Sequence, residues 1–290
     1  MPAWIAYSHA KINLGLYVLG KLPTGYHQIE TGFCFIEWKD HFDVKLSDEY
    51  VLNISDKSIP NDENNLISKA YHAFERYVGL KNHYTFNIRK SIPAGAGLGG
   101  GSSNAALTLR ILNKTEKAGL NEEDLIDISR TLGADVPFFI RGKTGIGRGL
   151  GHDIEPLDIQ PDSWIVTIYP GFESSTAEAY HYCTPNPEPE FELKEVLVNE
   201  SSDEWKYLLF NDLEAPVIAR NELIGNIKDQ VYDLGASYAS MTGSGSAIFG
   251  IFDQDFVAIN AYESFHKLGF LSNLTRPGFK PDRGIYLKED

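Results

Sequence analysis

Cysteine and basic residues are scarce in this chain, and long hydrophobic runs are missing. The two cysteines, Cys34 and Cys183, stand in surroundings without metal-ligand spacing, which predicts a reduced compartment rather than a metal site. With 26 Lys and Arg against 40 Asp and Glu, the formal net charge is −14. Because nucleic-acid phosphates select basic surfaces, this balance argues against a nucleic-acid partner.

No apolar run approaches membrane-spanning length, and no basic segment precedes an apolar stretch near residue 1. We therefore expect a cytoplasmic protein without a membrane partner. The hydrophobic content of 42% and the charged content of 23% are typical of a globular protein, and 290 residues suffice for two domains.

Hydrophobic periodicity alternates between strand and helix patterns along the chain, which predicts an α+β protein. The predicted strands cover residues 13–18, 33–46, 84–88, 138–140, 164–169 and 247–252, and the predicted helices cover 66–78, 103–117, 122–132, 215–234 and 256–268. A polar stretch with two prolines, Asp153 to Pro161, indicates a domain boundary. We place the domains at residues 1–154 and 155–290.

The stretch from Ile92 to Ala106 reads IPAGAGLGGGSSNAA and places five glycines and two hydroxyls directly before a predicted helix. A backbone with so few side chains can surround a bulky anion with its N–H groups. The N-terminus of the helix adds unpaired N–H groups and the positive end of its dipole. The pattern predicts a phosphate-binding loop.

Three other interpretations of the glycine stretch are weaker. Gly95, Gly97 and Gly100 fit a dinucleotide fingerprint, but the acids near the required distance, Glu116 and Glu122, end no strand. The spacing also resembles a Walker loop, except that Gly101 stands where its lysine is required. A simple glycine-rich turn before a helix is the remaining alternative, although so many glycines are costly to order.

Three segments in order resemble the motifs of the GHMP kinases. The glycine stretch is similar to the second motif, SHAKINLGL at residues 8–16 to the first, and MTGSGSAIFG at residues 241–250 to the third. The resemblance implies an ATP-dependent kinase with a ribosomal-S5-like N-terminal domain and a ferredoxin-like C-terminal domain. It also implies that ATP and Mg²⁺ are the cofactors.

Finer features favour one kind of family member. The segments KLPTGYHQI at 21–29, DENNLI at 62–67 and LGADVPFF at 132–139 resemble kinases of the non-mevalonate isoprenoid pathway. These enzymes phosphorylate the 2-hydroxyl of a methylerythritol that carries a cytidine diphosphate. The expected partner is this small molecule, and we expect a monomer or a weak homodimer.

Phosphoryl transfer to an alcohol needs a base for the hydroxyl proton and charge neutralisation around it. The resemblance implies that Asp135 is the base and that Lys11 assists it. From the residues alone, Asp135 is an acid just beyond a helix end, where a turn or capping role is the commoner interpretation. Lys11 lies in an apolar strand, and a buried lysine requires an acidic or phosphate partner.

The resemblance places ATP along the glycine stretch and close to the start of the helix at 66. The expected nucleotide-binding residues are Asn65, Pro93, Gly95, Gly97, Leu98, Gly99, Gly100, Gly101, Ser102 and Ser103. The two serines can donate hydrogen bonds to phosphate oxygens. Asn65 can also cap the helix that follows it, and the two roles are compatible.

A cytidine group calls for flat surfaces and a polar group at the base edge. We expect Tyr26 and Tyr180 to flank the base and His27 to hydrogen-bond its edge. The other expected substrate residues are Asn13, Thr176, Thr242 and Gly243. Without the resemblance, Tyr26 and His27 would be an exposed turn and Tyr180 a core aromatic.

Two features depart from the family pattern. His152 follows Gly149-Leu150-Gly151 where many members carry glutamate, and no magnesium-binding glutamate is evident, so we assign no metal ligand.

A GHMP kinase for homoserine or a sugar is one alternative function, although such substrates offer no base to stack. A nucleotide-binding regulator without turnover is the other.

Overall fold

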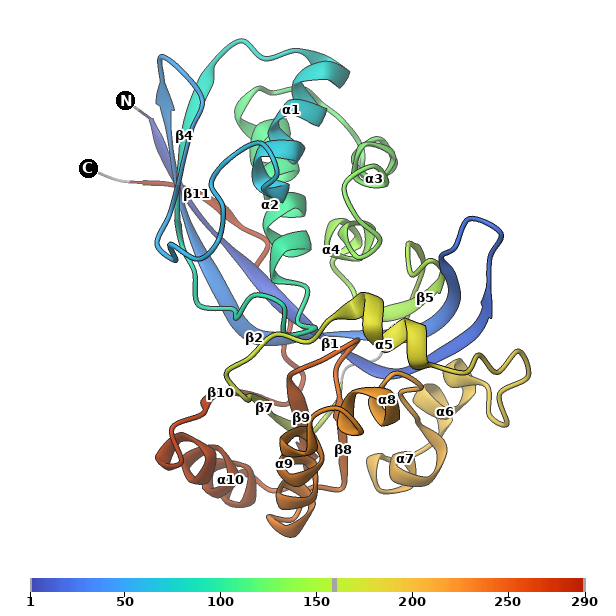
Figure 1. Ribbon diagram of the computed structural model, residues 1–290. Coiled ribbons are helices and arrows are strands. Elements are labelled where there is room, and N and C mark those ends of the chain that lie inside the picture. The colour runs from blue at the N-terminus through green and yellow to red at the C-terminus, as the bar shows by residue number, and fades with distance from the viewer. Residues whose placement is uncertain (1, 158–160, 289–290) are drawn as a thin grey trace.

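The computed structural model describes residues 2–157 and 161–288 and contains two sheets, one above the other in Figure 1. The larger sheet has seven strands in the order β11-β1-β2-β4-β3, with β5 paired to β2 and β6 to β5. Its strands are β1 (Ala3–Lys21), β2 (His27–Ser47), β3 (Val51–Ile54), β4 (His83–Arg89), β5 (Gly145–Gly149), β6 (Asp153–Pro156) and β11 (Ile285–Leu287).

Four helices pack together on one side of this sheet (Figure 1). They are α1 (Leu66–Val78), α2 (Gly100–Thr115), α3 (Glu122–Ser129) and α4 (Val136–Arg141). Their apolar faces and the inward residues of β2 and β4 form one buried core, which includes Phe42, Phe86 and Phe138. This core fixes α2 and α4 relative to β1, and these elements carry the candidate site.

The second sheet has the strand order β10-β7-β9-β8. Its strands are β7 (Trp164–Tyr169), β8 (Tyr238–Met241), β9 (Ile248–Phe252) and β10 (Leu271–Thr275), and the helices of this part are α5 (Thr176–Tyr182), α6 (Leu193–Asn199), α7 (Ser202–Leu208), α8 (Glu214–Ile218), α9 (Glu222–Asp233) and α10 (Asp255–Lys267). A βαββαβ unit in this order has the ferredoxin-like topology. The expected α+β class with a ferredoxin-like C-terminal part is confirmed.

Two sequence predictions of secondary structure are wrong. Residues 138–140 form helix α4 rather than a strand, because Pro137 suits a first helical turn and the Phe138 and Phe139 rings pack into the core. The helix expected over 215–234 is two helices, α8 and α9, and Asn221 caps the second. Packing and capping outweigh the local propensity in both places.

The chain path crosses the expected domain boundary. The cut between residues 154 and 155 falls inside β6, and β11 returns from the C-terminal part to pair with β1. Apolar residues of β1 and β9 meet in one buried cluster, which includes Ile12 and Phe249. The two parts are therefore joined in two ways: β11 passes from the C-terminal part into the first sheet, and apolar residues of both sheets form one buried core.

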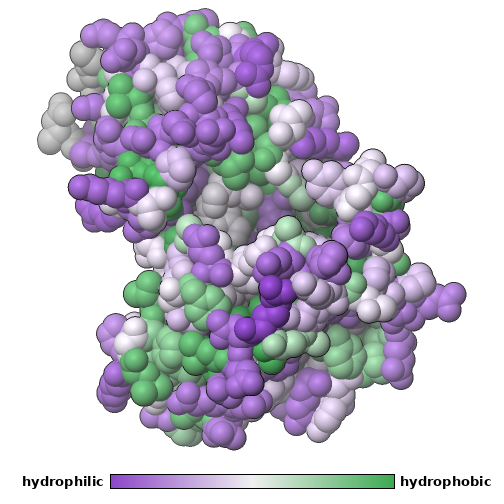
Figure 2. Space-filling view, viewed as in Figure 1, coloured by the Kyte–Doolittle hydropathy of each residue, from purple (hydrophilic) through white to green (hydrophobic). Residues whose placement is uncertain are grey.

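Hydrophilic residues cover most of the visible surface around the larger sheet, whereas hydrophobic residues gather lower down, toward the second sheet (Figure 2). Within residues 2–157 and 161–288, none of the helices has the length and the apolar character to cross a membrane.

Candidate functional site

The glycine stretch connects β4 to α2 and forms the floor of the site. The Leu98 carbonyl accepts a hydrogen bond of 3.0 Å from the Lys11 main-chain N–H, so the loop is attached to β1. Helix α2 begins at Gly100, and no side chain caps its N-terminus. An uncapped N-terminus of a 16-residue helix leaves N–H groups and a positive dipole end for an anion.

The Lys11 side chain is buried, with 4% of it exposed. Its Nζ donates to the Asn13 Oδ1 at 2.7 Å and to the Gly97 carbonyl at 3.0 Å, and it lies 3.4 Å from the Asp135 Oδ2. The acidic partner that a buried lysine requires is therefore Asp135, as expected. Its charge is neutralised beside the glycine loop.

Asp135 directly precedes α4, but its side chain makes no capping hydrogen bond to that helix. The side chain is 30% exposed, so one of its oxygens can face Lys11 while the carboxylate remains open to a ligand. The capping role that the sequence left open is excluded by this geometry. The carboxylate is available as a proton acceptor.

The third glycine motif brings the second sheet into the site. Thr242 Oγ1 accepts a 3.0 Å hydrogen bond from the Asn13 main-chain N–H and donates to the Asn13 Oδ1 at 3.0 Å. A Cβ added at Gly243 would lie 3.2 Å from the Asn13 Oδ1 and 3.6 Å from the Lys11 Nζ. Residues from all three motifs therefore meet within one cluster.

Two buried polar residues support this cluster and were not expected from the sequence. Thr31 accepts from the Asn13 Nδ2 at 2.8 Å and donates to the Gly15 carbonyl at 2.7 Å. Asn211 donates to the carbonyls of Met241 at 2.7 Å and Gly243 at 2.9 Å. Neither lies in a recognisable motif, so only the fold reveals them.

Ser103 and Asn65 have structural partners in the fold. The Ser103 hydroxyl is buried and donates to the His9 carbonyl at 2.7 Å, which connects α2 to β1. Asn65 caps α1 by accepting from the Ile67 N–H at 2.9 Å. Ser102, which is half-buried, keeps its place on the first turn of α2.

The aromatic residues are arranged differently from the expected pair. The ring of His27 stacks on the ring of Tyr180 with centroids 4.9 Å apart, whereas Tyr26 is 65% exposed. Tyr26 lies in the turn between β1 and β2, directly before the first residue of β2, His27. Burial, with Lys21 nearby, lowers the pKa of His27, and burial raises the pKa of Tyr180.

Thr176, at the start of α5, lies beside the third motif. Its hydroxyl is 2.7 Å from the hydroxyl of Ser244. This contact joins α5, which carries Tyr180, to the turn that carries Thr242 and Gly243. The aromatic pair and the lysine–aspartate pair are thereby linked through one turn.

Residues 2–157 and 161–288 contain no group of three or more His, Cys, Asp or Glu side chains that could hold a metal ion. Both cysteines are buried and free.

Comparisons with known proteins identify the family. Residues 65–143 match the GHMP kinases N terminal domain, and residues 193–269 match the GHMP kinases C terminal domain. A Parabacteroides distasonis protein named 4-diphosphocytidyl-2-C-methyl-D-erythritol kinase is 40% identical over 259 residues, which cover 86% of this chain and 92% of that protein. A protein of the same name from Chlorobium phaeobacteroides is 36% identical over 277 residues, 94% of each chain.

The solved structures show the same relationship. A crystal structure of 4-(cytidine 5'-diphospho)-2C-methyl-D-erythritol kinase matches with a TM-score of 0.80 and 29% identity, over 93% of this chain and 98% of that one. A mevalonate kinase structure shares the fold with a TM-score of 0.65 and 15% identity, over 94% of this chain and 98% of that one. The chain is thus a kinase of the GHMP family, and within this family it belongs with the 4-diphosphocytidyl-2-C-methyl-D-erythritol kinases.

Proposed function

We propose that the chain transfers the γ-phosphate of ATP to the 2-hydroxyl of 4-diphosphocytidyl-2-C-methyl-D-erythritol. The observation that carries this proposal is the Lys11–Asp135 pair, 3.4 Å apart, at the phosphate loop. An uncapped helix N-terminus, a glycine loop and an open carboxylate are the parts that transfer from ATP to an alcohol requires.

In this proposal, Asp135 accepts the proton of the 2-hydroxyl as the new P–O bond forms. Lys11 orients the carboxylate, and its ammonium group stabilises negative charge that develops between the alcohol and the phosphate. Its two other partners, the Asn13 Oδ1 and the Gly97 carbonyl, keep the ammonium group in one place. Lys11 lies on β1 and Asp135 directly precedes α4, and both elements contribute residues to the buried core of the larger sheet.

ATP would lie along the glycine stretch, with its phosphates at the start of α2. We propose that residues 93–102 bind the phosphates through their backbone and through the Ser102 hydroxyl. Ser103 instead holds α2 against β1. Mg²⁺ would arrive with ATP, held mainly by phosphate oxygens and water, since the ion retains several waters when bound. The ion would neutralise phosphate charge in a protein whose own net charge is −14.

The cytidine end would lie at the His27–Tyr180 stack. A lowered pKa keeps the His27 imidazole neutral at pH 7, so one ring nitrogen can donate and the other accept at the base edge. Tyr26 is exposed and would close over the base from the turn between β1 and β2.

Free, buried cysteines and the need for ATP support a cytoplasmic location.

The test is ADP release by the purified protein with Mg-ATP and one alcohol at a time. We expect turnover with 4-diphosphocytidyl-2-C-methyl-D-erythritol and background rates with homoserine, mevalonate and galactose. Turnover with one of the other alcohols would keep the kinase chemistry and contradict the cytidine site. ATP binding without turnover of any of these alcohols would favour a nucleotide-binding regulator without catalytic activity.

A further inference from the structure

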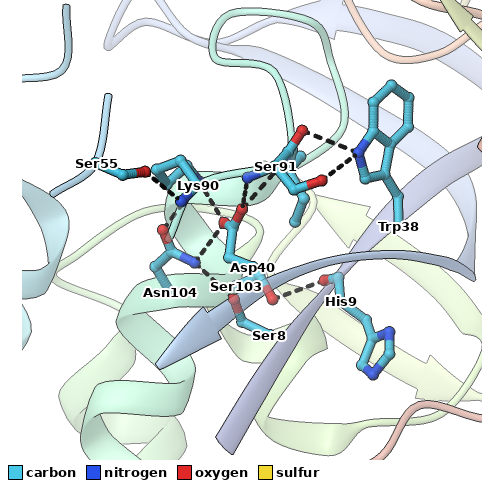
Figure 3. A network of polar contacts seen from close by, with 10 residues as sticks. Ser8, His9, Trp38, Asp40, Ser55, Lys90, Ser91, Ser103 and Asn104 are labelled. Carbon is cyan, nitrogen blue, oxygen red and sulfur yellow. Dashed lines mark hydrogen bonds and ion pairs between the residues drawn. The ribbon is translucent and has the colours of Figure 1, made fainter. Parts of the chain in front are cut away.

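A buried network lies behind the phosphate loop and touches the segment that enters it (Figure 3). Asp40, on β2, has none of its surface exposed. Its Oδ1 accepts hydrogen bonds from the main-chain N–H groups of Ser91 at 2.8 Å and Ile92 at 2.9 Å. These two residues lead from β4 into the loop, so the carboxylate fixes where the loop begins.

The other oxygen of the same carboxylate reaches the helix that ends the loop. The Asp40 Oδ2 accepts from the Asn104 Nδ2 at 2.9 Å, and Asn104 lies in the second turn of α2. The Asn104 amide also donates to the Ser8 hydroxyl at 2.6 Å, which adds β1 to the network. One carboxylate therefore connects the entry of the loop to the helix that receives its exit.

Lys90 supplies the positive charge that compensates the buried carboxylate of Asp40. Its ammonium group forms an ion pair with the Asp40 Oδ2 and donates to the Asn104 Oδ1 at 3.1 Å. The Lys90 side chain is 7% exposed, so both charges are largely removed from water. An unpaired buried carboxylate here would be costly and would also oppose an anionic ligand.

We propose that Asp40 is a positioning residue for ATP, an inference that rests on the proposed ATP site. By holding residues 91–92 and α2 at a fixed separation, it makes the loop N–H groups and the α2 N-terminus converge on the phosphates. Within the described residues, no hydrogen bond of Asp40 reaches Lys11, Asp135 or Tyr180. Its loss therefore weakens ATP binding without removing a direct contact to any of these three residues.

The experiment is calorimetric binding of Mg-ATP, combined with KM values for both substrates. Asp40→Asn keeps one acceptor oxygen for Ser91 and Ile92 but turns the other into a donor that faces Asn104 and Lys90. We expect the Kd and the KM for ATP to rise about tenfold or more, since small misplacements are costly in such sites, while the KM for the alcohol stays within about twofold. Asn104→Ala, which retains the Asp40–Lys90 pair, is expected to act in the same direction if Asp40→Asn does not fold.

Glu116→Gln is the matched control. Glu116 is another buried carboxylate, just past the opposite end of α2, and it accepts from the Lys81 N–H, the Asn82 Nδ2 and the Tyr84 hydroxyl. We expect it to lower Tm without changing ATP binding. Unchanged ATP binding in Asp40→Asn, or an equal loss in Glu116→Gln, overturns the positioning role. A lack of ATP binding in the unsubstituted protein overturns the proposed function itself.

Discussion

At the scale of single residues, the ammonium group of Lys11 joins three segments. An amide oxygen of β1, a carbonyl of the glycine loop and the carboxylate before α4 surround it. The sequence predicts the burial of Lys11 and its need for an acidic partner. It does not predict the burial of Asp40, although the side chains of Asp40, Phe42 and Val44 alternate onto the same, inward-facing side of β2.

Replacement of Asp135 by Asn tests the base at this scale. The amide cannot accept the hydroxyl proton, so we expect kcat to fall by about 10²–10⁴-fold, with little change in the KM for ATP. Steady-state kinetics measure the effect. Asp127→Asn, an exposed acid on α3, serves as the control and should be neutral. Near-normal kcat in folded Asp135→Asn would remove this residue from the role of base.

His9 makes the stability of the fold depend on pH. Burial, with Lys39 nearby, lowers its pKa from 6.5 to about 4, against smaller opposing effects of Asp282 and Glu37. Below pH 6.5 the unfolded chain binds a proton that the folded chain refuses, so stability falls as the pH drops from 6.5 toward 4. The loss from this group amounts to at most about 3 kcal/mol.

Urea unfolding at pH 7 and pH 4.5 measures this effect. The His9→Gln variant should lose less stability between the two pH values than the unsubstituted protein. His266→Gln, at an exposed position on α10, should leave the difference unchanged. Equal losses in the unsubstituted protein and in His9→Gln would contradict the assignment.

At the scale of elements, the glycine loop and the third motif touch through their backbones. Gly97 has a φ of 77°, and a Cβ there would lie 2.1 Å from the Thr242 carbonyl oxygen. The loop therefore needs glycine both for its conformation and for this close approach. The three motifs predict that such a loop exists, but they do not reveal that it packs against the turn at 242–245.

Gly97→Ala should push these two turns apart. We expect at least about a 10²-fold loss of kcat/KM, because a displacement near 1 Å is enough for such a loss. Gly119→Ala is the control, since Gly119 has a φ of 72° and an added Cβ there would have no neighbouring atom within 4 Å. Both alanine substitutions strain the backbone and should lower Tm. Only Gly97→Ala should also reduce the activity of the protein that remains folded. Equal activity losses would show that strain alone is responsible.

Elements were predictable where one pattern dominated. The strand at 164–169 and the helix at 66–78 match the structure, since alternation and four-residue spacing are clear there. The run Phe138-Phe139-Ile140 was assigned wrongly, because apolar residues favour a strand locally and the core contacts that make it helical come from other elements. Contacts of that kind, like those of Thr31 and Asn211, depend on the tertiary fold.

At the scale of the whole molecule, the last strand completes the first sheet. Trp4, Ile5 and Ala6 of β1 pair with β11. Arg283, just before this strand, donates to the Ile140 carbonyl at 2.6 Å, at the end of the helix that Asp135 precedes. The sequence does not predict this return, because three residues of strand carry too weak a pattern.

Removal of residues 283–290 should destabilise the N-terminal part of the fold. The truncated chain loses a strand pairing and the Arg283 hydrogen bond, so we expect Tm to fall by about 5–10 °C. Calorimetry measures this shift. The single variant Arg283→Met, which keeps β11, should give a smaller shift. An unchanged Tm after truncation would show that β11 contributes nothing to the first sheet.

The most direct test of the proposed reaction is ³¹P NMR of the product formed from Mg-ATP and 4-diphosphocytidyl-2-C-methyl-D-erythritol. The account predicts one new phosphate monoester resonance without three-bond coupling to a carbon-bound proton, because C2 carries the methyl group and no hydrogen. The cytidine diphosphate should remain intact, and one ADP should form for each monoester. ADP accompanied by inorganic phosphate, or a monoester on a different hydroxyl, would contradict the placement of the alcohol beside Asp135.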